Sequence, residues 1–295
     1  MADASLFLIV LTPLVGALLV LLTGRSPNLR ETMSILTGFA LLAQVISIAP
    51  GVLAGEIPHQ LLATPVPGLP IALALEPLGL LFALIASSLW IVTTVYAIGY
   101  MRGHGESDQT RFFTFFAIAI SATMGVALSA NLITLFLFYE LLTLSTYPLV
   151  THAGTAEARR GGRVYLGILI GTSMAFLLPA IIATWYFTGS VTFEAGGILA
   201  GKISPLTTGI LFALFAFGIG KAALMPFHRW LPAAMVAPTP VSALLHAVAV
   251  VKAGVFSILK IVIYVFGIDL LAQNGVRDLM LWVVAITILG ASIKI

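Results

Sequence analysis

Long apolar runs alternate with short polar stretches along the whole chain, and each run is long enough to cross a membrane as a helix. A run of about 18–25 residues spans about 30 Å of hydrocarbon at 1.5 Å per residue. The runs cover residues 4–22, 31–54, 76–100, 112–129, 131–151, 163–188, 207–225, 239–266 and 277–295. No segment shows the inside/outside alternation of a membrane barrel. The pattern therefore predicts an all-α polytopic bundle of about nine transmembrane spans, with a kink at Pro179.

Composition supports a membrane protein and excludes several other classes. The 295 residues are 60% hydrophobic and only 8% charged, whereas a soluble domain is roughly one quarter charged. The absence of cysteine excludes disulfides and thiolate-bound iron–sulfur clusters. The five histidines are scattered without metal-ligand spacing, so we expect no metal and no cofactor. No basic stripe or aromatic platform points to nucleic acid, and the lipid bilayer is the expected surrounding.

Charge asymmetry between the loops predicts the orientation. Loops on one side carry Arg25, Arg30, Arg102, Arg111, Arg159, Arg160, Arg163 and Arg229. The opposite loops carry only Lys202 and Arg277. By the positive-inside rule the arginine-rich side is cytoplasmic, which places the N-terminus outside.

One carboxylate, Glu140, lies near the middle of the 131–151 run. A charge in hydrocarbon costs several kcal/mol, with estimates from about 3 to above 10, so Glu140 should be turned away from lipid. In a purely structural interpretation, a hydroxyl of Thr143 or Tyr147 would satisfy this acid. We favour a role in ion movement, because an intramembrane carboxylate is by default a functional candidate.

Lys221 is a second charge at membrane depth, and the residues after it predict a break in the seventh helix. Pro226 removes a backbone N–H and clashes with the preceding turn, and Pro232, Pro238 and Pro240 follow. Broken helices are tolerated in membranes where they line a cavity, and transport sites form there. Snorkelling of Lys221 to the cytoplasmic face is the alternative, but apolar and aromatic residues continue beyond it.

Three more polar residues lie in the 239–266 run. Lys252 is in mid-span, roughly 15–20 Å from either interface by helical rise, so it cannot easily snorkel. His246 lies six positions earlier on a different face, and a relay role and a satisfied core histidine remain equally open. Lys260 lies two turns beyond Lys252, where snorkelling to the outer interface would explain it. We keep His246 and Lys260 as candidate relay residues.

Two sequence blocks in this part of the chain carry a resemblance to a known family. They are Pro-Phe-His-Arg-Trp-Leu-Pro at 226–232 and Ala-Pro-Thr-Pro-Val-Ser-Ala at 237–243. Together with Lys221, Lys252 and the Phe-Tyr-Glu sequence ending at Glu140, they resemble the antiporter-like subunits. These subunits are shared by Mrp-type cation/proton antiporters, respiratory complex I and membrane-bound hydrogenases. The resemblance covers roughly residues 76–295.

The resemblance implies both residue roles and domain organisation. The fifth-helix glutamate of the family maps onto Glu140, its partner lysine onto Lys221 and the continuing relay lysine onto Lys252, with His246 in the family's polar stretch. Residues 1–111 would be N-terminal helices and 112–266 a five-helix repeat carrying the charges. Residues 267–295 would be the first helix of a truncated second, inverted repeat.

The implied function is a proton-translocating, D-like subunit of a multisubunit Na+/proton antiporter of the Mrp type. Other membrane subunits, protons and Na+ would be its partners, in the inner membrane of a bacterium or archaeon. A proton-pumping subunit of an NADH-quinone oxidoreductase or hydrogenase complex is the second interpretation; in either case the chain carries no redox site of its own. A structural scaffold subunit is a third, from a different class of protein.

Overall fold

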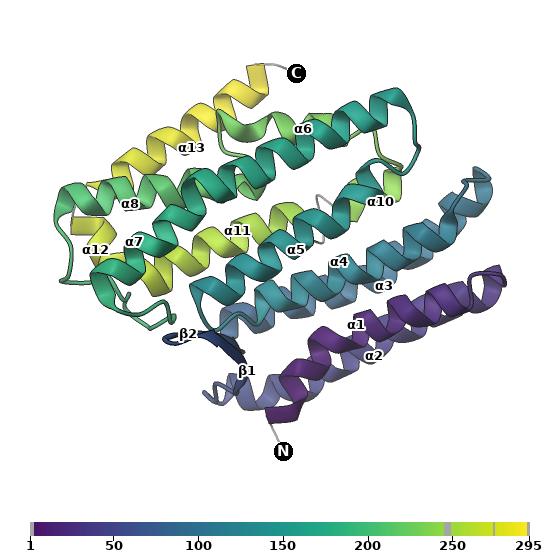
Figure 1. Ribbon diagram of the computed structural model, residues 1–295, viewed down its shortest axis with the longest axis horizontal. Helices are drawn as coiled ribbons and strands as arrows, with labels where there is room; N and C mark the ends of the chain where they lie inside the picture. Colours follow the sequence, from purple (N-terminus) through teal and green to yellow (C-terminus); the bar gives the residue numbers. More distant parts are fainter. Residues whose placement is uncertain (1–2, 245–248, 274, 294–295) are drawn as a thin grey trace.

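The computed structural model describes residues 3–244, 249–273 and 275–293 as a bundle of helices lying side by side (Figure 1). The longer elements are α1 (Asp3–Leu22), α2 (Pro27–Leu53), α3 (Pro77–Gly103), α4 (Gln109–Ala127), α5 (Leu132–Val150), α6 (Ala156–Thr172), α7 (Leu178–Thr188), α8 (Pro205–Gly218), α11 (Val250–Lys260) and α13 (Val276–Ile293). The short helices are α9 (Trp230–Ala234), α10 (Thr239–Ala243) and α12 (Ile268–Gln273). Within the described residues, five helical stretches are long and apolar enough to cross a membrane. The arrangement is that of a multi-pass helical membrane protein.

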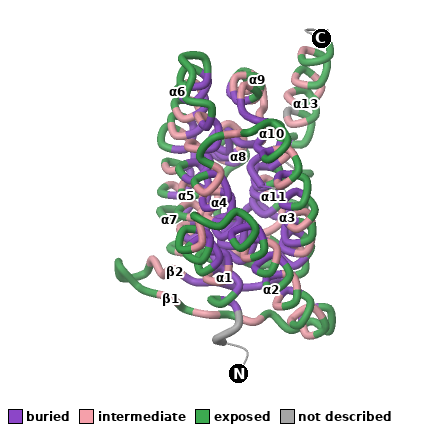
Figure 2. Tube along the Cα trace, turned by 90° about the vertical axis from the view of Figure 1, so that its right-hand side faces the viewer, coloured by how far each residue is buried: buried purple, intermediate pink, exposed green. Residues whose placement is uncertain are grey.

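Helix α4 forms the centre of the N-terminal part of the bundle. It packs against α1, α3 and α5, and its aromatic side chains Phe112, Phe113 and Phe116 are almost fully buried. Figure 2 shows buried positions concentrated in the inner helices and exposed positions on the outer ones. A helix that is apolar on all sides belongs in the interior of a bundle, and α4 occupies that place.

A β-hairpin follows α2, which the helical pattern of the sequence did not predict. Strands β1 (His59–Val66) and β2 (Leu69–Ala74) pair antiparallel, with Gly68 in the turn at φ +80°. The hairpin is tied to the α4–α5 turn, because the Ala74 N–H donates to the Leu128 carbonyl at 2.7 Å and the Ala130 N–H donates to the Ala72 carbonyl at 3.1 Å. It lies at the same end of the bundle as the N-terminus (Figure 1).

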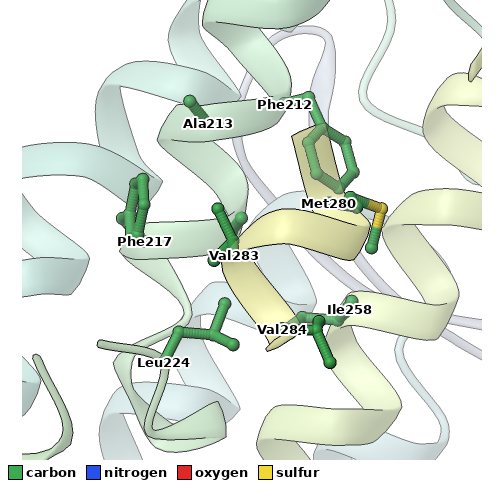
Figure 3. A pocket seen from close by; sticks show the side chains of 9 residues that line it. Phe212, Ala213, Phe217, Leu224, Ile258, Met280, Val283 and Val284 are labelled. Carbon is green, nitrogen blue, oxygen red and sulfur yellow. The ribbon is translucent and has the colours of Figure 1, made fainter. Parts of the chain in front are cut away.

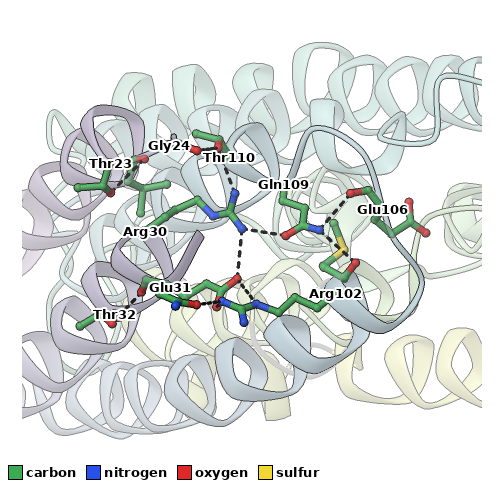
Figure 4. Close-up of polar contacts among 12 residues, drawn as sticks. Thr23, Gly24, Arg30, Glu31, Thr32, Arg102, Glu106, Gln109 and Thr110 are labelled. Carbon is green, nitrogen blue, oxygen red and sulfur yellow. Dashed lines mark hydrogen bonds and ion pairs between the residues drawn. The ribbon is translucent and has the colours of Figure 1, made fainter. Parts of the chain in front are cut away.

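A buried polar cluster joins α2, α3 and α4 at the other end, where the arginine-rich loops lie (Figure 4). The Glu31 carboxylate pairs with Arg102 Nη2 at 2.6 Å and with Arg30 Nη2 at 3.2 Å. Arg30 also donates to the Gln109 side-chain oxygen at 2.8 Å. Because Arg30 and Glu31 are each only 4% exposed, this network fixes three helix ends relative to one another.

Among the described residues, π-helical turns interrupt the long helices of the C-terminal part at two places. One, Ser173–Leu177, joins α6 to α7 just before Pro179, which is where the sequence predicts a kink; the other, Ile261–Phe266, continues α11. Gly218, at the end of α8, packs directly on the first π turn, and an added Cβ there would collide with the backbone of Leu177. π turns are frequent at functional sites, and this one lies against the point where α8 ends.

Candidate functional site

The seventh apolar run is interrupted, and Lys221 lies in the interruption. Helix α8 ends at Gly218, and a single 3₁₀ turn, Gly220–Ala222, follows. Ala223 then takes a left-handed conformation with φ +56°, which is rare for a residue with a Cβ. Trp230 stabilises the interruption, because its Nε1–H donates to the Gly220 carbonyl at 2.8 Å.

Lys221 is completely buried, and α5 provides its immediate contacts. Its ammonium donates to the Tyr139 carbonyl at 2.8 Å and to Thr143 Oγ1 at 2.5 Å. It also lies over the Tyr139 ring, 3.3 Å from the ring centroid, and the Lys221 N–H donates to the Tyr139 hydroxyl at 3.0 Å. Lys221 therefore does not snorkel, and its closest partners are neutral groups.

Glu140 is next to Tyr139 on α5, and its two carboxylate oxygens are buried without a hydrogen-bond partner in the described part of the chain. No ion pair within 4.0 Å joins Glu140 to Lys221 among these residues. The structural interpretation, in which a hydroxyl of Thr143 or Tyr147 satisfies the acid, is therefore wrong. An unpartnered buried carboxylate is costly, so Glu140 does not stabilise the bundle through a hydrogen bond to a described residue.

Helix α11 crosses the interruption and carries Lys252. Gly254 allows this close crossing, since a Cβ there would collide with the backbone of Lys221 and Ala222. The Lys252 side chain itself is exposed and lies in a groove of about 320 Å³ between α3 and α11 whose other lining residues are apolar. The fold thus brings the backbone of the Lys252 segment to Lys221 without bringing the two ammonium groups into contact. His246 lies outside the described residues.

The interpretation of Lys260 as a snorkelling residue is wrong. Its side chain is fully buried and pairs with Glu76 at 2.6 Å, and its ammonium also donates to the Ser129 carbonyl. The rings of Phe193 and Phe256 lie 4.7 and 5.4 Å from this ammonium. Sequence reasoning missed Glu76, although an acid at the first position of the 76–100 apolar run is a signal by which it could have been found.

An apolar pocket of about 190 Å³ lies beside the interruption, between α8, α11 and α13 (Figure 3). Phe217 and Leu224, on the two sides of Lys221 in the chain, both line it, together with Met280 and Val283 of α13. A pocket of this kind offers water no hydrogen-bond partners. The pocket therefore places apolar side chains, and no polar side chain, beside the interruption.

Comparison with solved structures identifies the fold. The chain superimposes on a chain of the Mrp complex from a Dietzia species with a TM-score of 0.74 and 22% identity, covering 88% of this chain and 48% of that one. A chain of the archaeal membrane-bound sulfane sulfur reductase gives a TM-score of 0.73 at 22% identity, covering 86% and 52%.

Sequence comparison gives the relatives. A probable K(+)/H(+) antiporter protein of Rhizobium meliloti, its A/B subunit, is 32% identical over 268 residues, which are 88% of this chain and 26% of the relative. A chloroplastic NAD(P)H-quinone oxidoreductase subunit 5 of Ipomoea purpurea is 32% identical over 198 residues, 63% of this chain and 27% of the relative. The chain thus spans about a quarter of the length of these curated relatives.

Residues 129–294 match the family described as "NADH:quinone oxidoreductase/Mrp antiporter, TM". This segment begins at the α4–α5 turn and contains Glu140, Lys221 and Lys252. It confirms the resemblance inferred from the two proline-containing blocks. The chain belongs to the NADH:quinone oxidoreductase/Mrp antiporter family of membrane proteins.

Proposed function

We propose that the chain is a proton-translocating subunit of a multisubunit monovalent cation/proton antiporter of the Mrp type. In this proposal Glu140, Lys221 and Lys252 form the relay within the repeat at residues 112–266. The observation that carries the proposal is the arrangement at the interrupted helix. A fully buried lysine lies there beside a carboxylate whose oxygens have no partner in the described chain.

In the proposed mechanism, burial and ion pairing have opposite effects on the charged form of Lys221. Burial disfavours the charged form of a lysine, whereas a nearby carboxylate favours it. When Glu140 approaches Lys221, the ammonium is stabilised and Lys221 takes up a proton. When the two groups separate, Lys221 releases this proton towards Lys252, on the helix that crosses the interruption.

Coupling to cation movement requires a partner that biases the Glu140–Lys221 separation. We propose that this partner is an adjoining membrane protein of the same assembly, as the relatives named as antiporter subunits suggest. The exchanged cation would be Na+ or another monovalent ion. We also propose that the arginine-rich loops face the cytoplasm of a bacterial or archaeal cell and that the N-terminus faces out.

Single substitutions in the intact assembly test the proposal. Glu140→Ala and Lys221→Ala should each abolish cation-driven proton movement in vesicles from a strain that lacks its own antiporters. Glu157→Ala and Lys202→Ala are matched controls, because both side chains are exposed outside the site, and they should leave transport unchanged. Normal transport by Glu140→Ala or Lys221→Ala at equal protein level would refute the relay.

The quinone oxidoreductase relative favours a second candidate, a proton-pumping subunit of a redox-driven complex. The relay residues and their chemistry would be the same, and only the source of energy would differ. Copurification distinguishes the two candidates: small antiporter subunits support the first, whereas iron–sulfur, nickel or flavin subunits support the second. If the chain is only a scaffold, charge-removing substitutions leave transport intact while deletion of the chain dissolves the assembly.

A further inference from the structure

We propose that Tyr139 is a positioning residue that holds the Lys221 ammonium between its separation from Glu140 and the release of its proton. The proposal rests on the relay role of Lys221 stated above, but it concerns a residue to which that relay gives no part. Tyr139 touches Lys221 through three different groups: its ring, its backbone carbonyl and its hydroxyl.

The ring lies where it compensates for the missing carboxylate contact. The Lys221 Nζ is 3.3 Å from the ring centroid, inside the distance of about 6 Å at which an ammonium is attracted to an aromatic face. Tyr139 and Lys221 are both 0% exposed, so water does not screen this attraction. The ring face can thus hold the ammonium in place after Glu140 has moved away and before Lys221 releases its proton.

The hydroxyl has a different task, since it acts on the backbone rather than on the charge. Where α8 ends, the Lys221 N–H no longer has its place in the helical hydrogen-bond ladder, and the Tyr139 hydroxyl accepts it at 3.0 Å. A buried N–H without a partner is strongly disfavoured. The hydroxyl therefore fixes the interruption, and the ring acts on the side chain that the interruption carries.

Two substitutions separate these tasks. Tyr139→Phe keeps the ring and removes the hydroxyl, so it should lower the melting temperature while transport stays within about threefold of wild type. Tyr139→Leu removes both groups and should reduce transport by about 30-fold, the factor that corresponds to a desolvated cation–π contact. Phe215→Leu is the matched control, because it removes a buried ring on α8 that contacts Phe266 rather than Lys221, and it should lower stability without this loss of transport.

A fluorination series tests the ring in variants of nearly constant shape. Phenylalanine with one, two or three ring fluorines at position 139 should show transport falling with each fluorine, because fluorine withdraws the negative charge of the ring face. Equal transport across the series, or Tyr139→Phe as inactive as Tyr139→Leu, would overturn the role of the ring. Normal transport by Tyr139→Leu would also overturn it. If Lys221→Ala and Glu140→Ala themselves transport normally, it is the relay that fails.

Discussion

The Glu76–Lys260 pair allows a quantitative test of how much a buried ion pair contributes to the free energy of unfolding of this bundle. The two side chains come from the start of α3 and the end of α11 and lie 2.6 Å apart, with 10% and 0% of their side-chain surfaces exposed. We predict that removing either charge alone destabilises the protein strongly. Removing both charges together should cost far less.

The magnitudes follow from the geometry. Two unit charges at 2.6 Å attract by about 6 kcal/mol at an effective dielectric constant of about 20. Taking both ions out of water costs several kcal/mol each, which offsets most of this attraction. Loss of one partner leaves the other buried and unpaired, which should cost about 3–5 kcal/mol. An apolar pair of similar volume avoids both costs and should lie within about 1–2 kcal/mol of wild type, because the Ser129 carbonyl loses a donor.

The assay compares Glu76→Gln, Lys260→Met and the double variant Glu76→Leu/Lys260→Met. Each is purified in detergent, and its free energy of unfolding is measured by denaturation in mixed micelles followed by circular dichroism. Asp278→Asn is the control, since the Arg277–Asp278 pair is 68% and 66% exposed, and it should change stability by less than about 0.5 kcal/mol. A double variant as unstable as the sum of the two single variants would refute this reasoning.

Two further predictions concern the crossing of α11 and a loop at the arginine-rich end. Gly254→Ala should reduce both transport and stability, because the added methyl group would collide with the backbone at Lys221. Gly209→Ala is the control: an added methyl group there has open space, so the substitution should be neutral or slightly stabilising. For both variants, transport is measured at equal protein level and stability as the melting temperature. Burial and the charge of Arg111 lower the pKa of His152. Its neutral form therefore contributes stability that is present above the unfolded pKa of about 6.5 and is lost as the pH falls below it. The melting temperature should drop more between pH 7.5 and 5 for wild type than for His152→Gln, and equal drops would contradict this assignment.

The sequence predicts the helices well because their cause is local. Apolar runs of membrane length must be helical, and each described long helix lies within or close to an expected run. The interruption after Gly218 is also local, since glycine and proline cannot sustain a regular helix there. Both features can be found without knowing which helices touch.

The contacts between helices could not be predicted in the same way. Glu76 and Lys260 are separated by most of the chain, and no sequence feature near either residue indicates that the two form an ion pair. The rotation of α11, which exposes Lys252 and buries Lys260, has no signal in a helix that is apolar on most sides, because lipid and protein interior are equally apolar. The β-hairpin depends on bonds to the α4–α5 turn and is likewise decided by the assembled bundle.

Lys221 and Lys260 are both fully buried in the described part of the chain, but their ammonium groups contact different kinds of partner. The ammonium of Lys260 is in direct contact with the Glu76 carboxylate, which balances its charge. Loss of a proton from Lys260 would leave the Glu76 carboxylate without an ion-pair partner. Lys221 has a ring face, a carbonyl and a hydroxyl as its contacts, while the carboxylate of Glu140 remains unpartnered close by. Neutral contacts hold an ammonium without making its loss prohibitive, because no counter-ion is left behind at contact distance. Of these two lysines, Lys221 therefore fits the proposed relay better, because no described carboxylate is in contact with its ammonium.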